Sequence, residues 1–139
     1  MTVDDVTLNK AASIERAIAR VHAEHAGQRE NLYDDQTKQD AIILNLQRAC
    51  EAAIDLAMHL VARRRLGVPQ TSRDAFDLLA AGAVIDPALA VAMKRMVGFR
   101  NIAVHDYQKL SLPIVEAIIA NELAGLLAFA RAALALAAP

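Results

Sequence analysis

The chain has 139 residues, of which 55% are hydrophobic and only 4% are aromatic, with no tryptophan, five glycines and four prolines. This length suits one domain with a substantial core, and the shortage of glycine and proline argues against a sheet of many strands. The net charge of −1 argues against a generally basic nucleic-acid-binding protein. The charge is uneven, however, because residues 1–60 carry ten acidic and six basic side chains, whereas residues 61–139 carry six acidic and nine basic ones. We therefore expect a helical domain with local cationic surface in its second half.

The single cysteine and the residues near both ends of the sequence indicate the cellular compartment in which we expect the protein. Cys50 cannot form an internal disulfide, and its place in an apolar helical pattern favours a buried small hydrophobe over a nucleophile. The start of the chain is acidic, with Asp4 and Asp5, and lacks the basic-then-apolar layout of a signal peptide. The apolar stretch 123–138 is interrupted by Arg131 and is shorter than a membrane span requires. We expect a cytoplasmic protein that makes no membrane contact.

The first predicted helix runs from about Val6 to Ala26. Asp4 or Asp5 can cap its free amide groups, and Gly27 suits the left-handed position that ends many helices. Residues 28–36 are polar and are expected to form a linker.

The second predicted helix runs from about Lys38 to Leu66, with Thr37 as its N-cap and Asp40 three residues later. Its apolar residues cover more than one stripe of the helix surface: Ile42, Ile43, Leu46, Ala49, Cys50, Ala53, Ile54, Ala57, Leu60 and Val61. A helix this widely apolar must be covered on several sides. We therefore expect it to be the central helix of a bundle and to take part in a subunit interface.

Three further helices complete the expected all-α, five-helix bundle. Ser72 is the predicted N-cap of a short helix over Arg73–Ala81, and the Asp86–Pro87 pair is typical of the start of the fourth helix. Ser111 and Pro113 are expected to start the last helix, which continues to about Ala137.

The fourth helix leads into a cluster of residues that could bind phosphate or transfer protons. Arg100 carries a permanent charge in a planar fork that matches phosphate geometry, and His105 can both donate and accept a proton near neutral pH. On one continuous helix these two side chains would point roughly 140° apart. An Arg/His site therefore requires either that the helix ends between them or that a second subunit supplies one of them. The simpler interpretation of such residues is a helix cap with a few surface contacts.

A row of polar residues lies at near-helical spacing on the second helix: Asn45, Arg48, Asp55 and His59. The simpler interpretation is a solvated or salt-bridged row, with Asp55 and His59 as a pair four residues apart. The functional interpretation places the row along the cleft of the motif, with Arg48 and Asp55 as its best candidates. His22 and His25 lack a Cys or acidic partner that would complete a metal site, so we expect no bound metal and no cofactor.

Residues 100–107 match the pattern R-x4-H-x-Y and directly follow the segment Met96-Val97-Gly98-Phe99. This pattern resembles the active-site motif of HepT-like toxins, which belong to the HEPN superfamily of all-α ribonucleases. The resemblance extends along the chain, through the segments Arg48–Asp55, Gly67–Pro69 and Phe76–Leu79. It implies a single HEPN domain over residues 1–139.

The resemblance also implies an activity and a role for each motif residue. The protein would be a metal-independent endoribonuclease toxin that acts as a homodimer whose motifs converge on one cleft. His105 would be the general acid or base, Arg100 would stabilise charge on the phosphate, and Asn101 would orient the phosphate or cap the helix.

The family implies a partner as well. HepT-like toxins are commonly paired with a small MntA-like nucleotidyltransferase that transfers AMP to the motif tyrosine, which is Tyr107 here. Two alternatives remain open: a non-catalytic HEPN partner that binds nucleotide or the nucleotidyltransferase, and a purely structural helical dimer.

Overall fold

The computed structural model describes residues 3–136, and these residues contain only helices. Their order is α1 (Asp5–His25), α2 (Arg29–Tyr33), α3 (Gln36–Arg63), α4 (Ser72–Ala81), α5 (Pro87–His105), the short 3₁₀ helix η1 (Tyr107–Lys109), α6 (Leu112–Asn121) and α7 (Leu123–Ala135). The all-α prediction is confirmed for this part of the chain.

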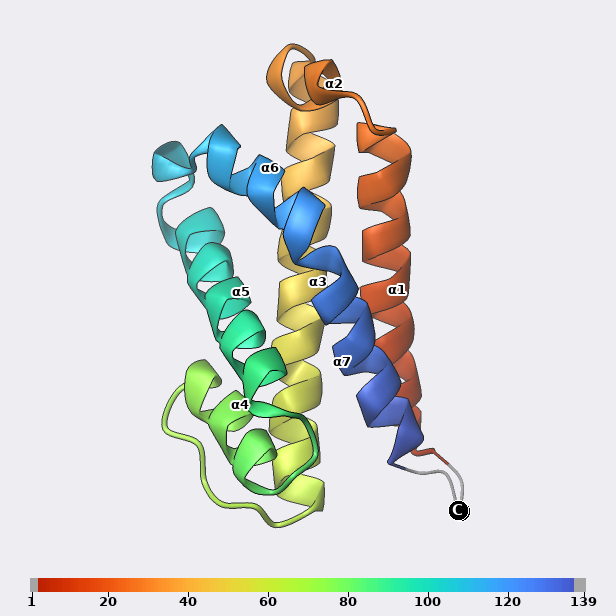
Figure 1. Ribbon diagram of the computed structural model, residues 1–139, viewed down its shortest axis with the longest axis vertical. Coiled ribbons are helices and arrows are strands. Elements are labelled where there is room, and N and C mark those ends of the chain that lie inside the picture. Colours follow the sequence, from red (N-terminus) through yellow and green to blue (C-terminus); the bar gives the residue numbers. More distant parts are fainter. Residues whose placement is uncertain (1–2, 137–139) are drawn as a thin grey trace.

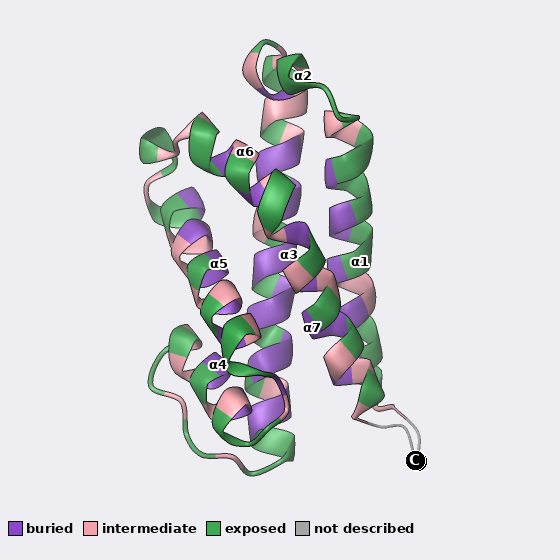
Figure 2. Cartoon of the chain, in the orientation of Figure 1, coloured by how far each residue is buried: buried purple, intermediate pink, exposed green. Residues whose placement is uncertain are grey.

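Helix α3 is the centre of the bundle. In Figure 1 it runs the length of the molecule, with α1 along one side and α5 along the other, while α7 lies across the face where α1 and α3 meet. Helix α4 packs at the end of α3 and α5 that lies farthest from α2. Buried residues recur along α3 from Ile42 to Val61 (Figure 2), because neighbours cover this part of the helix from several sides.

The core is aliphatic with a small aromatic centre. Phe76 of α4 and Phe129 of α7 are both buried, and their rings meet edge to face with centroids 5.3 Å apart. This pair connects α4 with α7, two helices that are far apart in the sequence. Cys50 is also buried, as the sequence predicted.

The helices begin with the kinds of N-cap residue that the sequence predicted, but in two helices the capping residue is a different one. Asp4 caps α1 and Asp86 caps α5, and Pro87 takes the first turn of α5 as expected. The cap of α3 is Asp35 rather than Thr37, because the Asp35 carboxylate accepts the backbone N–H of Lys38. Likewise the Thr71 side chain, not Ser72, caps α4.

The described residues form seven α-helices rather than the five expected. The predicted linker contains α2, where Leu32 is fully buried and anchors one helical turn against α3. The expected last helix divides at Glu122 into α6 and α7, which are bent by 49°. Glu122 pairs with Arg95 of α5 at 3.0 Å, and the bend lets α6 pack near α2 while α7 packs against α1.

Within residues 3–136, none of the helices alone has both the length and the apolar composition of a membrane span. The bent pair of α6 and α7 meets those two criteria only when its halves are counted together.

Candidate functional site

Helix α5 carries Arg100, Asn101 and His105 on one unbroken helix. It begins at Pro87, ends at His105 and is followed by η1, which carries Tyr107. The helix therefore does not end between Arg100 and His105, and their side chains leave its axis in directions roughly 140° apart. The first of the two ways to unite them, a helix that ends between them, is therefore excluded.

Arg100 points toward α3. Its guanidinium lies close enough to Cys50 for its charge to lower the thiol's pKa, although burial dominates and raises that pKa to about 12. The Arg100 Nε atom is buried and has no hydrogen-bond partner among residues 3–136. A buried donor without an acceptor destabilises a fold by about 1–3 kcal/mol, so this atom calls for an acceptor from outside residues 3–136.

His105 is exposed at the last residue of α5. On the helix it lies roughly 60° from Ile102 and therefore on the side away from Arg100. Asn101 is half-buried beside Arg100 on the same helix. A histidine in the last turn is free to meet substrate from solvent, whereas Arg100 is held in the bundle.

Tyr107 folds back onto the start of α3. Its hydroxyl donates a hydrogen bond to Asp40 Oδ1 at 3.0 Å, and the amide of Gln36 donates to the same oxygen at 2.8 Å. The pKa of Tyr107 is raised above its usual value, first by partial burial and then by the hydrogen bond and charge of Asp40. In the sequence Asp40 stands only near a predicted helix cap, and no sequence signal links it to a residue 67 positions away.

The polar row of α3 does not gather at the motif within one chain. Arg48 and Asp55 line a groove of about 540 Å³ between α1 and α3, where Asp55 pairs with Lys10 at 3.1 Å. Asn45 is buried and donates to the carbonyl of Ala41. His59 approaches Asp4 at 2.7 Å and so fixes the start of α1, rather than pairing with Asp55.

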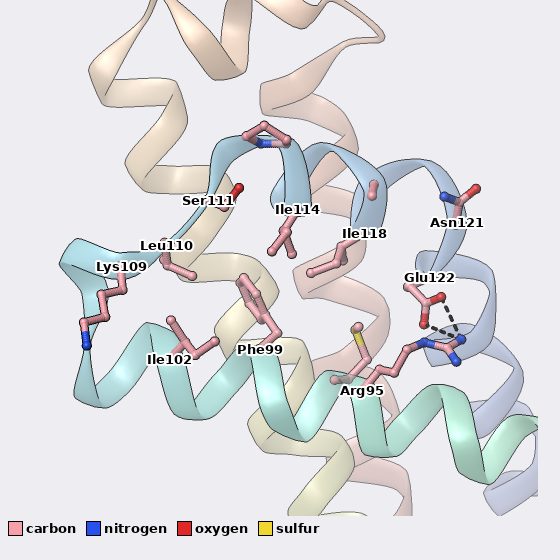
Figure 3. A pocket seen from close by; sticks show the side chains of 13 residues that line it. Arg95, Phe99, Ile102, Lys109, Leu110, Ser111, Ile114, Ile118, Asn121 and Glu122 are labelled. Atoms are coloured by element: carbon pink, nitrogen blue, oxygen red, sulfur yellow. Dashed lines mark hydrogen bonds and ion pairs between the residues drawn. The ribbon is translucent and has the colours of Figure 1, made fainter.

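A second hollow lies between α5 and α6. It has a volume of about 410 Å³ and a mostly apolar lining that includes Phe99, Ile102 and Ile114 (Figure 3). The ion pair of Arg95 and Glu122 lies at one end of the view, and Lys109 lies at the other. Residues 3–136 contain no group of three or more His, Cys, Asp or Glu side chains that could hold a metal ion.

Comparison with known proteins gives this geometry its context. The family model described as "Ribonuclease HepT-like" matches residues 14–133. The chain belongs to the HepT-like ribonuclease family. The resemblance noted in the sequence is thereby confirmed, and Arg100, His105 and Tyr107 fall inside the matched region of this HepT-like chain.

Individual relatives agree with the family. The mRNA nuclease HepT of Shewanella oneidensis is 47% identical over 121 residues, which are 87% of this chain and 90% of the relative. The tri-AMPylated Shewanella oneidensis HEPN toxin, solved in complex with an MNT antitoxin, superposes with a TM-score of 0.87 at 45% identity, covering 94% of this chain and 97% of that one. A toxin–antitoxin complex with AMP-PNP also has a TM-score of 0.87, at 44% identity, covering 93% of this chain and 97% of that one. The HepT-like chain thus has the HEPN toxin fold.

Proposed function

We propose that this protein is the toxin of a toxin–antitoxin module and cuts RNA as a metal-independent endoribonuclease. The observation that carries the proposal is Arg100 of the R-x4-H-x-Y motif, whose buried Nε atom has no hydrogen-bond partner among residues 3–136. The 47% identity to an mRNA nuclease supports it. The whole chain, residues 1–139, would act as one HEPN domain in the cytoplasm, where RNA is available.

The chemistry needs only proton transfer and charge stabilisation, because RNA supplies its own nucleophile. The 2′-hydroxyl attacks the adjacent phosphorus, the bond to the 5′-oxygen breaks, and a cyclic phosphate and a free 5′-hydroxyl result. His105 takes the proton from the 2′-hydroxyl or gives one to the leaving oxygen, a role worth about 10²–10⁴-fold in rate. Arg100 stabilises the additional negative charge on phosphorus, which is worth about 10²–10³-fold by analogy with oxyanion donors.

A homodimer completes the site. Because Arg100 and His105 diverge on one unbroken helix, the imidazole that acts with a given Arg100 comes from the other subunit. An RNA phosphate in that cleft supplies the acceptor that Arg100 Nε lacks. Asn101 supports the phosphate from the next position on the helix.

Arg48 and Asp55 would support RNA at a distance from the scissile bond. Their groove also contains Lys10, Arg16 and Arg20, so its basic side chains outnumber its acidic ones, Glu51 and Asp55. Such a groove suits the phosphates of a flanking stretch of RNA, with Asp55 holding Lys10 in place.

Neutralisation would occur at Tyr107. This side chain is 46% exposed beside the motif, so a nucleotidyltransferase of the MntA type could reach its hydroxyl. Transfer of AMP adds bulk and a negative phosphate next to Arg100 and His105, which excludes an RNA phosphate from the same cleft.

The test compares RNA cleavage by the wild-type dimer with that by His105→Ala and Arg100→Ala, at matched helicity by circular dichroism. The proposal expects both variants to lose at least about 10²-fold in rate. The matched controls are His22→Ala on α1 and Arg131→Ala on α7, two exposed residues on other helices, which should leave cleavage unchanged. A wild-type dimer that binds a nucleotidyltransferase but cuts no RNA would instead support the non-catalytic partner.

A further inference from the structure

The Tyr107–Asp40 pair joins two parts of the chain that meet only in the folded protein. Tyr107 lies in η1 after α5, and Asp40 lies near the start of α3. The hydroxyl and the carboxylate oxygen are 3.0 Å apart, and Gln36, one turn before Asp40 on α3, donates to the same oxygen at 2.8 Å. Both Tyr107 and Asp40 are exposed, so a partner enzyme can approach the pair from solvent.

A tyrosine hydroxyl needs a proton acceptor before it can attack phosphorus efficiently. The raised pKa of Tyr107 keeps the phenol protonated near neutral pH. A carboxylate within about 2.6–3.2 Å of the hydroxyl oxygen is in reach to act as a general base. The Asp40 oxygen satisfies this distance, and a hydroxyl that donates its proton to Asp40 keeps its lone pairs free for the incoming phosphorus.

We propose that Asp40 is the general base for adenylyl transfer to Tyr107, so that the toxin itself supplies a catalytic group for its own inactivation. This inference rests on the proposed modification of Tyr107. The Tyr107 oxygen attacks the α-phosphorus of a nucleoside triphosphate that the partner enzyme holds, and a new oxygen–phosphorus bond forms. The bond from the α-phosphorus to the pyrophosphate oxygen breaks, pyrophosphate leaves, and the phenol proton passes to the Asp40 carboxylate and then to solvent.

Gln36 is the positioning residue of this arrangement. Its amide holds Asp40 Oδ1 from within α3, which limits the rotation of an otherwise exposed carboxylate. Gln36 touches neither the phenol nor the phosphate in the proposed step. Its removal should therefore have a smaller effect than the removal of the carboxylate.

The transfer of AMP changes the interaction between Tyr107 and Asp40. Once Tyr107 carries AMP, its oxygen has no proton to donate, so the hydrogen bond to Asp40 is lost. The new phosphodiester and the Asp40 carboxylate are both negative and repel each other. This repulsion moves the adenylyl group away from Asp40.

The experiment measures the initial rate of AMP transfer from α-labelled ATP to the full-length toxin by its cognate nucleotidyltransferase, with the modified peptide identified by mass spectrometry. The variants are Asp40→Asn, Asp40→Ala, Asp40→Glu, Gln36→Ala and Tyr107→Phe. The matched control is Asp77→Asn, which neutralises a partly exposed aspartate of α4 that pairs with Lys94 and lies far from Tyr107 along the chain. Helicity and dimer mass are checked for each variant.

The inference expects Asp40→Asn and Asp40→Ala to lower kcat about 10²-fold with little change in the KM for toxin or ATP. Asp40→Glu should restore part of the rate, and Asp77→Asn should match the wild type. Asparagine can still accept the hydrogen bond but cannot take the proton, so a wild-type rate in Asp40→Asn would overturn the base assignment. A wild-type toxin that is never labelled at Tyr107 would overturn the proposed modification and this inference together.

Discussion

Arg100 and His105 lie five residues apart on a single helix that remains unbroken between them, so their side chains point in directions roughly 140° apart. One is held in the bundle near Cys50, and the other is exposed at the end of α5. Within one subunit the helix thus turns the two groups away from each other. The proposed site is therefore shared between subunits.

Mixed dimers test this sharing directly. A dimer that pairs an Arg100→Ala subunit with a His105→Ala subunit retains one complete shared site, so it should cut RNA at about half the wild-type rate. Each variant alone should be inactive. The mixed dimers are isolated with two different affinity tags and assayed for RNA cleavage at equal concentration.

The matched control pairs a wild-type subunit with a subunit that carries both substitutions. If the site is shared, both sites of this dimer lack one group and cleavage is lost. If each subunit held its own complete site, this dimer would keep about half the activity and the first mixed dimer would have none. The two preparations thus give opposite results under the two arrangements.

Tyr107→Phe should leave the toxin active while preventing its neutralisation by the nucleotidyltransferase. Phenylalanine keeps the ring but has no hydroxyl to receive AMP, and it loses only an exposed hydrogen bond to Asp40, worth about 0.5–1.5 kcal/mol. We expect RNA cleavage close to the wild-type rate and growth inhibition that the nucleotidyltransferase no longer relieves. Growth is compared with and without co-expression of that enzyme; full protection of the variant would place the modified residue elsewhere.

The Cys50 thiol should not react with thiol reagents in the folded protein. The side chain is buried, and burial raises its pKa to about 12, so almost none of the thiol is ionised near pH 8. We expect no reaction with Ellman's reagent in native buffer and one equivalent of reaction in guanidinium chloride. Rapid labelling of the native protein would contradict the burial of Cys50.

Asp4 should stabilise the fold in a pH-dependent way. Its carboxylate accepts the backbone N–H and the hydroxyl of Thr7 and approaches His59, and the backbone hydrogen bond is the main reason that its pKa is lowered below the ordinary 3.8. A lowered pKa in the folded state stabilises the protein above the unfolded value, and this contribution is lost as the pH falls below it.

We therefore expect Asp4→Ala to lower the free energy of unfolding by about 1 kcal/mol near neutral pH. The difference from the wild type should shrink as the pH drops below about 4. Urea denaturation of the wild type and the variant, near neutral pH and again below pH about 4, measures this difference in the free energy of unfolding. Asp5→Ala is the neighbouring control, since Asp5 lies in the first turn without capping it and should have a smaller effect.

The sequence determined the elements that depend on local interactions. The Asp86–Pro87 pair fixes the start of α5, because a carboxylate cap and a proline in the first turn act within a few residues. The apolar pattern of α3 predicted a central helix, since periodicity reports which faces must be covered. The motif letters, read with their context, were enough to indicate the family that the comparisons confirm.

Only the tertiary structure decided the rest. The apolar stretch that forms α6 and α7 has no polar stripe to mark a bend, so the break at Glu122 follows from its ion pair with Arg95 and from the helices it must cover. Arg48 and Asp55 face the groove beside α1, although their spacing allowed them to line the motif. Asp40 meets Tyr107 across 67 residues because α5 packs along α3, and contacts between helices arise from packing that no local pattern encodes.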